Sequence, residues 1–402
     1  MRIIDSGRVA LHLLLPSKAR DLEIHSMRHI RRLLAALTGA LLAVASLEVS
    51  IRFLEPQDAT YWDSSKFRRL LTTTPHFVEN IPNAQSTFLG APVSINDMGL
   101  RGPHIDLPKP LKTFRILVVG DSITFGYGVG NTEPYPALLE SVLNGKCHGT
   151  HYEVLNGATL GGGLGDYFHF LTTKADELQA DLLIVGVAIN DILPYTDSGA
   201  TGEHDPKSFS PQSRRTRRLN RFLLTHSHLY SFIYARTKSS LYATHFIDMD
   251  REQGWNLLAL RDPSDDQIVA WDKTTIMLSK ITAFGSARHL PVLVLSFPLR
   301  LQMSLDQLEY YRKKYGLNIS ASAVDGSPQR RLNDISRHLG ARFLDLLPIF
   351  RRYVPEAVFL HNDRISDDAS HLSPLGHLIT AEAISDTLHD VCDLPTSTRD
   401  RM

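Results

Sequence analysis

Residues 115–126 of the chain read RILVVGDSITFG, and this stretch decides the fold class. Arg115–Val119 is a short, mostly apolar run of the kind that forms a strand buried on both faces. Ser122 follows shortly afterwards, where we expect the chain to turn from the strand into a helix. A buried strand that leads directly into a helix favours an α/β domain with a parallel sheet.

Four further apolar runs alternate with segments of helical periodicity downstream. Strands that alternate with helices pair in parallel, and the helices then cover the faces of the sheet. Five strands suffice for a flavodoxin-like three-layer sandwich, so the sequence predicts an α/β fold with a five-stranded parallel sheet. The further expected strands are Tyr152–Leu155, Asp181–Val187, Pro291–Ser296 and Ala341–Leu346.

Polar or glycine-rich segments follow four of the five expected strands, at the carboxyl edge where open α/β sheets bind ligands. Ser122 comes after the first strand, and a glycine cluster at 157–165 comes after the second. Asn190 follows the third strand, and Asp368 and His371 follow the last. We expect these residues to gather in one site.

Their chemistry indicates nucleophilic acyl transfer. A serine hydroxyl needs a base to take its proton, and His371 is the base whose partner can be identified locally. Asp368 precedes it by three residues, so its carboxylate can bind Nδ1 and leave Nε2 facing Ser122. The pattern predicts activity that rises as His371 loses its proton, near its ordinary pKa of about 6.5. His361 and His377 are expected to be structural.

Taken together, these blocks resemble the SGNH hydrolases, also called GDSL esterases and lipases, over about residues 114–388. The resemblance implies the SGNH hydrolase fold and ester chemistry with a triad of Ser122, His371 and Asp368, without metal or cofactor. It also implies an oxyanion hole made by the N–H of Ser122, the N–H of Gly161 and the side-chain amide of Asn190.

Three details qualify this resemblance. Gly162 and Gly163 are alternatives to Gly161. Ala188 stands where the family usually has a glycine two residues before the asparagine, which puts the local backbone path in question. The segment Asn96–Gly102 resembles one in membrane-anchored bacterial members.

The N-terminal region predicts export. Met27–Arg32 is basic, and Leu33–Leu47 carries no charge. Apolar residues continue to Leu54, so Leu33–Leu54 is long enough for a transmembrane anchor, with a cleaved signal peptide or a buried soluble helix as alternatives. Both export interpretations place the residues after 55 outside the cytoplasm, in the periplasm or the extracellular space. Met27 is an alternative start to Met1.

We therefore expect five regions: a cytoplasmic tail (1–32), an anchor or signal segment (33–54), a lead-in (55–113), a hydrolase domain (114–392) and a tail (393–402). The domain carries an insertion at about 197–265, where a helix with a basic start is amphipathic. That helix is either a solvated cover of the site or a contact with anionic lipid or polysaccharide. Cys147 and Cys392 are expected near the same sheet edge, so a disulfide between them is a hypothesis.

The composition and charge of the chain disfavour some classes of binding partner. The chain has 43 basic and 43 acidic residues and a formal net charge of zero, which gives no field for a nucleic acid. No Lys and Ser/Thr pair follows the glycines of 120–126, which disfavours nucleotide binding, and no zinc motif occurs. The expected partners are an acyl ester, carried by a glycan or a lipid-like molecule, and a membrane. An O-acyltransferase or a non-catalytic glycan-binding protein are the alternative functions.

Overall fold

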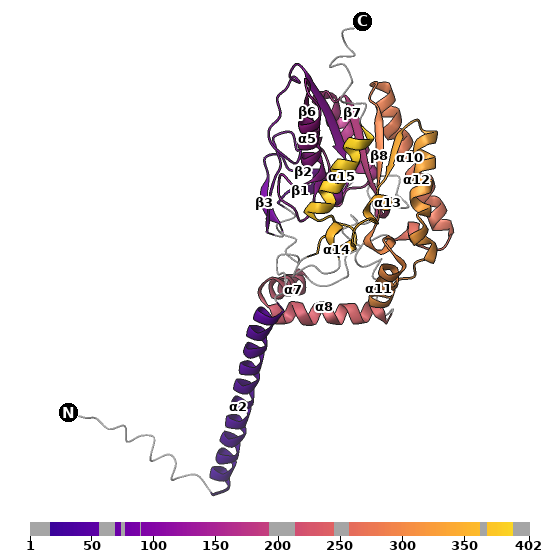
Figure 1. Ribbon diagram of the computed structural model, residues 1–402. Coiled ribbons are helices and arrows are strands. Elements are labelled where there is room, and N and C mark those ends of the chain that lie inside the picture. The colour runs from indigo at the N-terminus through magenta and orange to yellow at the C-terminus, as the bar shows by residue number, and fades with distance from the viewer. Residues whose placement is uncertain are drawn as a thin grey trace, which may run out of the picture.

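The computed structural model describes residues 17–55, 69–73, 77–88, 90–192, 214–244, 257–361 and 368–388. At its centre five strands form one parallel sheet, β5 (Thr113–Val119), β6 (His151–Asn156), β7 (Leu182–Ala188), β8 (Val292–Phe297) and β9 (Arg342–Asp345). Their order is β6-β5-β7-β8-β9 (Figure 1). This is the flavodoxin-like order, which confirms the predicted fold class.

The sheet is buried on both faces, as its apolar strands predict. In β5, Leu117 and Val119 enter one core, while Ile116 and Val118 enter the other. None of these four side chains is exposed to solvent. Since successive residues of a strand point to opposite faces, an unbroken apolar run is what a covered sheet requires.

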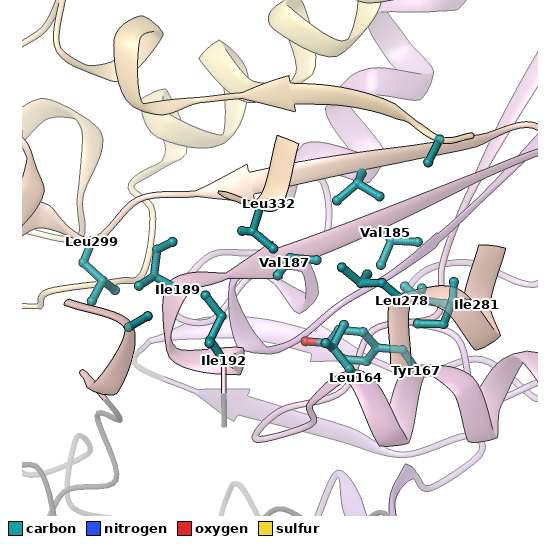
Figure 2. Packing of buried hydrophobic residues seen from close by; sticks show 14 of the residues in the cluster. Leu164, Tyr167, Val185, Val187, Ile189, Ile192, Leu278, Ile281, Leu299 and Leu332 are labelled. Atoms are coloured by element: carbon teal, nitrogen blue, oxygen red, sulfur yellow. The ribbon is translucent and has the colours of Figure 1, made fainter. Parts of the chain in front are cut away.

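Helices that follow β6, β7 and β8 cover the first face. Leu164 and Tyr167 pack there with Val185 of β7 and with Leu278 and Ile281 of the longest of these helices (Figure 2). The helices are α6 (Leu164–Leu178), α10 (Asp265–Ala287), α11 (Leu305–Tyr315) and α12 (Ser327–His338). The short turns η3 (Leu258–Leu260) and η5 (Ala321–Asp325) lie beside them.

The second face is covered by α5 (Tyr135–Lys146) and α15 (Pro374–Thr387), with α13 (Leu347–Phe350) and α14 (Pro355–Val358). As expected, α5 and α15 lie side by side, and Lys146 Nζ binds Asp386 at 3.0 Å. Cys147 directly follows α5, is buried and does not carry a free thiol. Cys392 lies outside the described residues.

The lead-in packs against this domain through two small antiparallel pairs of strands. They are β1 (Leu71–Thr73) with β2 (Val78–Asn80), and β3 (Gln85–Phe88) with β4 (Ala91–Ser94). Downstream of them, Arg101 N donates to Asn156 O at the end of β6, at 2.9 Å. The lead-in therefore reaches the carboxyl edge of the central sheet.

The N-terminal helix α2 spans Ser17–Leu54 and leaves the domain as a long rod (Figure 1). It begins ten residues before Met27, within the segment 1–32 that is expected to be a cytoplasmic tail. No glycine or proline lies between Ser17 and Thr38, so nothing in this stretch interrupts a helix. By length and composition His29–Leu54 can cross a membrane, although a signal sequence passes the same test.

The described part of the insertion forms two helices, α7 (Arg214–His226) and α8 (His228–Ala243), where the sequence predicts one amphipathic helix. The break lies at Ser227, whose hydroxyl accepts a hydrogen bond from Tyr230 N at 3.1 Å. A serine that binds the N–H three residues downstream is a helix N-cap, so it starts a new helix here. The flanking segments 193–213 and 245–256 lie outside the described residues.

Candidate active site

Ser122 begins the four-residue helix α4 (Ser122–Phe125), which follows directly on β5. The preceding residue, Asp121, caps this helix, and its Oδ1 accepts a hydrogen bond from Ile123 N at 2.9 Å. Ser122 is half-buried and lies at the carboxyl edge of the sheet. The strand-to-helix turn therefore presents its hydroxyl at the place where the sequence predicts a site.

His371 lies between Ser122 and Asp368. Its Nε2 is 2.9 Å from Ser122 Oγ, and its Nδ1 is 2.8 Å from Asp368 Oδ2. The other carboxylate oxygen of Asp368 accepts hydrogen bonds from the backbone N–H groups of Ser370 and His371, at 3.0 and 2.7 Å. The structure thus brings the three expected triad residues into one chain of hydrogen bonds.

Neighbouring elements hold the segment that carries Asp368 and His371. Arg300, in the short turn η4 (Arg300–Gln302) after β8, donates its backbone N–H to Ala369 O at 2.6 Å. Leu360 N donates to His371 O at 2.8 Å, just beyond α14. These bonds fix the backbone on both sides of the imidazole, so its position does not depend on side-chain contacts alone.

Burial and neighbouring charges have opposite effects on the pKa of His371. Burial lowers the pKa of His371, but the charge and hydrogen bond of Asp368, with a smaller contribution from the charge of Asp121, raise it above its ordinary value. For Asp368, burial raises the pKa, and the interactions with His371 outweigh that effect and lower it. Asp368 is therefore a carboxylate near neutral pH, and it favours the protonated imidazole.

Tyr127 covers one face of the imidazole. Its ring stacks on that of His371 with centroids 3.9 Å apart and an interplanar angle of 18°. The residue lies just after α4, and its backbone N–H donates to Ser122 O at 2.9 Å. The sequence analysis missed Tyr127 because no local pattern pairs it with a histidine 244 positions away.

Arg101 holds the loop on which Tyr127 lies. The guanidinium is buried and donates to four backbone carbonyls, those of Phe125, Gly126, Val129 and Gly130. Gly126 has φ +89°, and a Cβ there would lie 2.7 Å from the guanidinium, so glycine permits this close approach. Burial lowers the pKa of Arg101 to about 9, opposed by the charge of Glu133, so the group stays charged near neutral pH.

The proposed oxyanion donors come from three adjacent strands, β6, β5 and β7. Gly161 follows β6, is exposed and has φ +71°, a conformation that favours glycine. Asn190 lies after β7 in the short turn η1 (Ile189–Asp191). The strand order therefore brings Gly161 and Asn190 to either side of Ser122 at the carboxyl edge. Ala188 is fully buried in the second core, so its methyl group packs beneath the site.

Two buried carboxyl groups lie behind the nucleophile, and sequence reasoning assigned neither a role in the site. Burial raises the pKa of Asp121 to about 6, opposed by hydrogen bonds and by the charge of His371. Burial, with the charge of Asp121, raises the pKa of Asp191 well above its ordinary value. Asp191 Oδ2 accepts hydrogen bonds from Ala188 N and Tyr167 Oη, both at 3.0 Å, and so holds the turn that carries Asn190.

The remaining expectations concern other histidines and metals. His377 is fully buried in α15, and its Nδ1 accepts a hydrogen bond from Tyr135 N, the first residue of α5, at 3.2 Å. Burial lowers its pKa to about 3, so it is a neutral structural residue. His361 lies on the surface after α14. Across the ranges that the structure describes, no group of three or more His, Cys, Asp or Glu residues is arranged to hold a metal ion.

Comparison with known proteins places this site in a family context. Residues 118–274, which include Ser122, Gly161 and Asn190, match the model of the GDSL-like lipase/acylhydrolase family. No curated protein sequence matches the chain.

Several solved structures resemble the chain at low sequence identity. An α/β hydrolase from the metagenome of Lake Arreo, Spain, is 15% identical, with 69% of this chain and 95% of that chain covered and a TM-score of 0.39. A lipase/acylhydrolase from Enterococcus faecalis is 12% identical, with 69% and 96% covered and a TM-score of 0.39. An acetylxylan esterase from Geobacillus stearothermophilus is 14% identical, with 70% and 95% covered and a TM-score of 0.39.

Proposed function

We propose that the chain is a serine esterase of the GDSL-like lipase/acylhydrolase family, whose model matches residues 118–274, and that Ser122 is its nucleophile. Its substrates are acyl esters. They are either O-acetyl or other short acyl esters on envelope glycans, or lipid-like esters. The observation that carries the proposal is the chain of hydrogen bonds from Ser122 Oγ through His371 to Asp368, at 2.9 and 2.8 Å.

In the first half of the reaction, Ser122 Oγ attacks the ester carbonyl carbon while its proton passes to His371 Nε2. The carbonyl oxygen becomes an oxyanion, which accepts hydrogen bonds from the N–H of Ser122, the N–H of Gly161 and the amide of Asn190. The carbon–oxygen bond to the alcohol then breaks. The alcohol leaves with the proton from His371, and the acyl group stays on Ser122.

In the second half, a water molecule gives its proton to His371 Nε2 and attacks the acyl carbon. The second oxyanion collapses, the acid leaves, and Ser122 Oγ regains the proton. Asp368 keeps Nδ1–H oriented and compensates the positive charge that the imidazole carries in each half. If a sugar hydroxyl reaches the acyl-enzyme in place of water, the same residues catalyse O-acyl transfer.

The location that we propose is a membrane, with α2 as the anchor and the catalytic domain outside the cytoplasm. The support is the candidate span His29–Leu54, whose apolar window is not buried in the domain, and the basic residues Arg28, Arg31 and Arg32 that precede its uncharged run. Basic residues flanking an apolar helix favour the cytoplasmic side.

The proposal is tested on the purified full chain with an activated acetyl ester as substrate. We expect Ser122→Ala to lower kcat by about 10³-fold or more, because triad residues act as a unit. Ser141→Ala, an exposed serine on α5, is the matched control and should keep full activity. An active Ser122→Ala protein overturns the assignment, and an inactive parent chain supports a glycan-binding protein. Product analysis with an acetylated glycan and a free acceptor separates hydrolysis from transfer.

A further inference from the structure

The two helices of the insertion are fastened to the distal end of α2. The carboxylate of Glu48 accepts hydrogen bonds from the hydroxyl of Ser227 and from the backbone N–H groups of His228 and Leu229, at 2.8, 2.9 and 2.9 Å. The two N–H groups belong to the first turn of α8, where backbone donors have no partner within the helix itself, so a residue of α2 caps α8. A cap supplied from 180 positions away fixes the position of α8 relative to α2.

Two further contacts strengthen the attachment. Arg52 Nη2 donates to His226 O at the end of α7, at 2.9 Å, and Arg52 Nε binds Glu48 at 2.7 Å. Just beyond the end of α2, Glu55 pairs with Arg236 of α8 at 3.0 Å. The polar contacts thus begin at Glu48, directly after the uncharged run Leu33–Leu47. In a membrane, α7 and α8 would therefore lie where α2 leaves the apolar layer.

The amino-acid composition of α7 suits the interface between water and the apolar layer of a membrane. Its thirteen residues, RRTRRLNRFLLTH, include five arginines and no acidic residue. Leu219 and Phe222 on α7 are 58% and 56% exposed, and Ile233 on α8 is 53% exposed. Helices that combine arginines with exposed large apolar side chains lie in the interface of a bilayer, and anionic lipids attract them. The end of α2, which packs against α8, also carries exposed large apolar side chains, Phe53 and Leu54.

The carboxyl edge of the sheet faces the same side. Helix α8 packs against α11, and α11 contacts η4, which binds the backbone of Ala369 beside the candidate triad. Helix α14, whose last residue Val358 accepts a hydrogen bond from Ser373 N, lies between the sheet and the two helices of the insertion (Figure 1). The residues of the candidate site are therefore on the side of the domain from which α2 projects.

From these observations we propose that α7 and α8 form a membrane-contact platform. The platform lies on the anionic lipid surface from which α2 emerges, and it holds the candidate active site toward that surface. This proposal rests on the proposed membrane anchor and not on the esterase chemistry. The occupant of the exposed apolar residues is the lipid headgroup layer, because the arginine-rich sequence of α7 complements anionic phosphates and α8 packs against the end of the candidate membrane span.

The test uses the full chain in nanodiscs of phosphatidylglycerol and phosphatidylcholine in equal parts, with brominated acyl chains as quencher. Phe222→Trp places a fluorophore on the platform, and Leu219→Trp is a second version of it. Val44→Trp on α2 marks the bilayer core, and Leu111→Trp, at a 95% exposed residue before β5, marks the opposite edge of the sheet. The emission of the parent chain is subtracted. The Tm and the far-UV circular dichroism spectrum of each variant report the fold, and hydrolysis of a soluble acetyl ester is measured separately.

We expect brominated lipid to lower the emission of Phe222→Trp and Leu219→Trp about twofold, and that of Leu111→Trp not at all. Replacing phosphatidylglycerol with phosphatidylcholine should weaken the quenching at Phe222→Trp, and the substitutions Arg217→Glu and Arg218→Glu should do the same. Quenching at Val44→Trp without quenching at either platform tryptophan overturns the proposal. Absence of quenching at Val44→Trp removes the anchor and the platform together. A loss of soluble esterase activity in the parent chain concerns the proposed function alone.

Discussion

The phenol ring of Tyr127 lies on the imidazole of His371, with centroids 3.9 Å apart. Ser122 and Asp368 bind the two nitrogens of the same imidazole, so the ring is held at both edges and on one face. An aromatic face attracts a cation, and the imidazole becomes a cation in each half of the proposed reaction. We therefore infer that Tyr127 is a positioning residue for the base.

Replacing the aromatic ring should slow the reaction. An aromatic pair contributes about 0.5 to 1.5 kcal/mol beyond its buried area, so Tyr127→Leu should lower kcat about 2- to 12-fold. It should also lower the apparent pKa of kcat/KM, because the protonated imidazole loses the π face. Tyr127→Phe keeps the ring and should restore both values. An equal loss in Tyr127→Phe would assign the effect to the hydroxyl and contradict stacking.

A second prediction concerns Arg101. Arg101→Leu removes the guanidinium donor from four backbone carbonyls, and a buried carbonyl that is left unsatisfied costs about 1 to 3 kcal/mol. We expect a lower Tm together with a lower kcat, because the loop that carries Tyr127 loosens.

Arg115→Leu is the matched control for this loss. Arg115 is equally buried, but it binds Glu153 and Leu178 O, away from the candidate site. That variant should lower the Tm and leave kcat per folded molecule unchanged. Equal effects of the two substitutions on kcat would show that Arg101 acts through stability alone.

The five strands and the grouping of Ser122, His371 and Asp368 could be predicted because the sequence signals for them are local. A buried parallel strand is an apolar run, and Asp368 and His371 lie three positions apart. Arg101 and Tyr127 carry no such signal, since a buried arginine and a surface arginine look alike in sequence, and the partners of both residues come from other segments. At the break between α7 and α8, Ser227 is a local N-cap, but the carboxylate that binds the first N–H group of α8 belongs to Glu48, 180 positions away. Long-range contacts of this kind are set by the fold, so no local sequence pattern indicates them.

The pH dependence should differ from the expectation based on an unperturbed histidine. Asp368 and Asp121 raise the pKa of His371, and only the neutral imidazole can take the proton of Ser122. Activity should therefore rise with pH through an apparent pKa above about 6.5. Measuring kcat/KM for a soluble ester between about pH 5 and 9 gives this value.

The variant Asp121→Asn tests how much the charge of Asp121 contributes to this pH dependence. An asparagine oxygen can still accept the hydrogen bond from Ile123 N, so the cap of α4 remains. Removing the negative charge should lower the pKa of His371 and shift the profile to lower pH, with little change in the plateau. A shift to higher pH would contradict the assigned sign. Burial and the charge of Arg101 lower the pKa of His377, and that arginine is unchanged in this variant.

The last prediction concerns Asn190 and separates two roles for it. As an oxyanion donor, its amide N–H binds an oxygen that carries negative charge only during the reaction. Asn190→Ala should then lower kcat by about 10² to 10³ with little change in KM, because the lost interaction stabilises the transition state and not the bound ester. As a turn residue of η1, Asn190 would affect stability and leave kcat intact.

Asn190→Asp distinguishes these roles. Aspartate has nearly the same shape and also favours turns, so a structural role predicts that it retains activity. As a carboxylate it offers no N–H and places negative charge beside the oxyanion, so the donor role predicts a loss at least as large as that of alanine. Asp191 continues to hold the turn through Ala188 N in both variants, which keeps the backbone in place. An active Asn190→Asp enzyme would therefore remove Asn190 from the oxyanion hole.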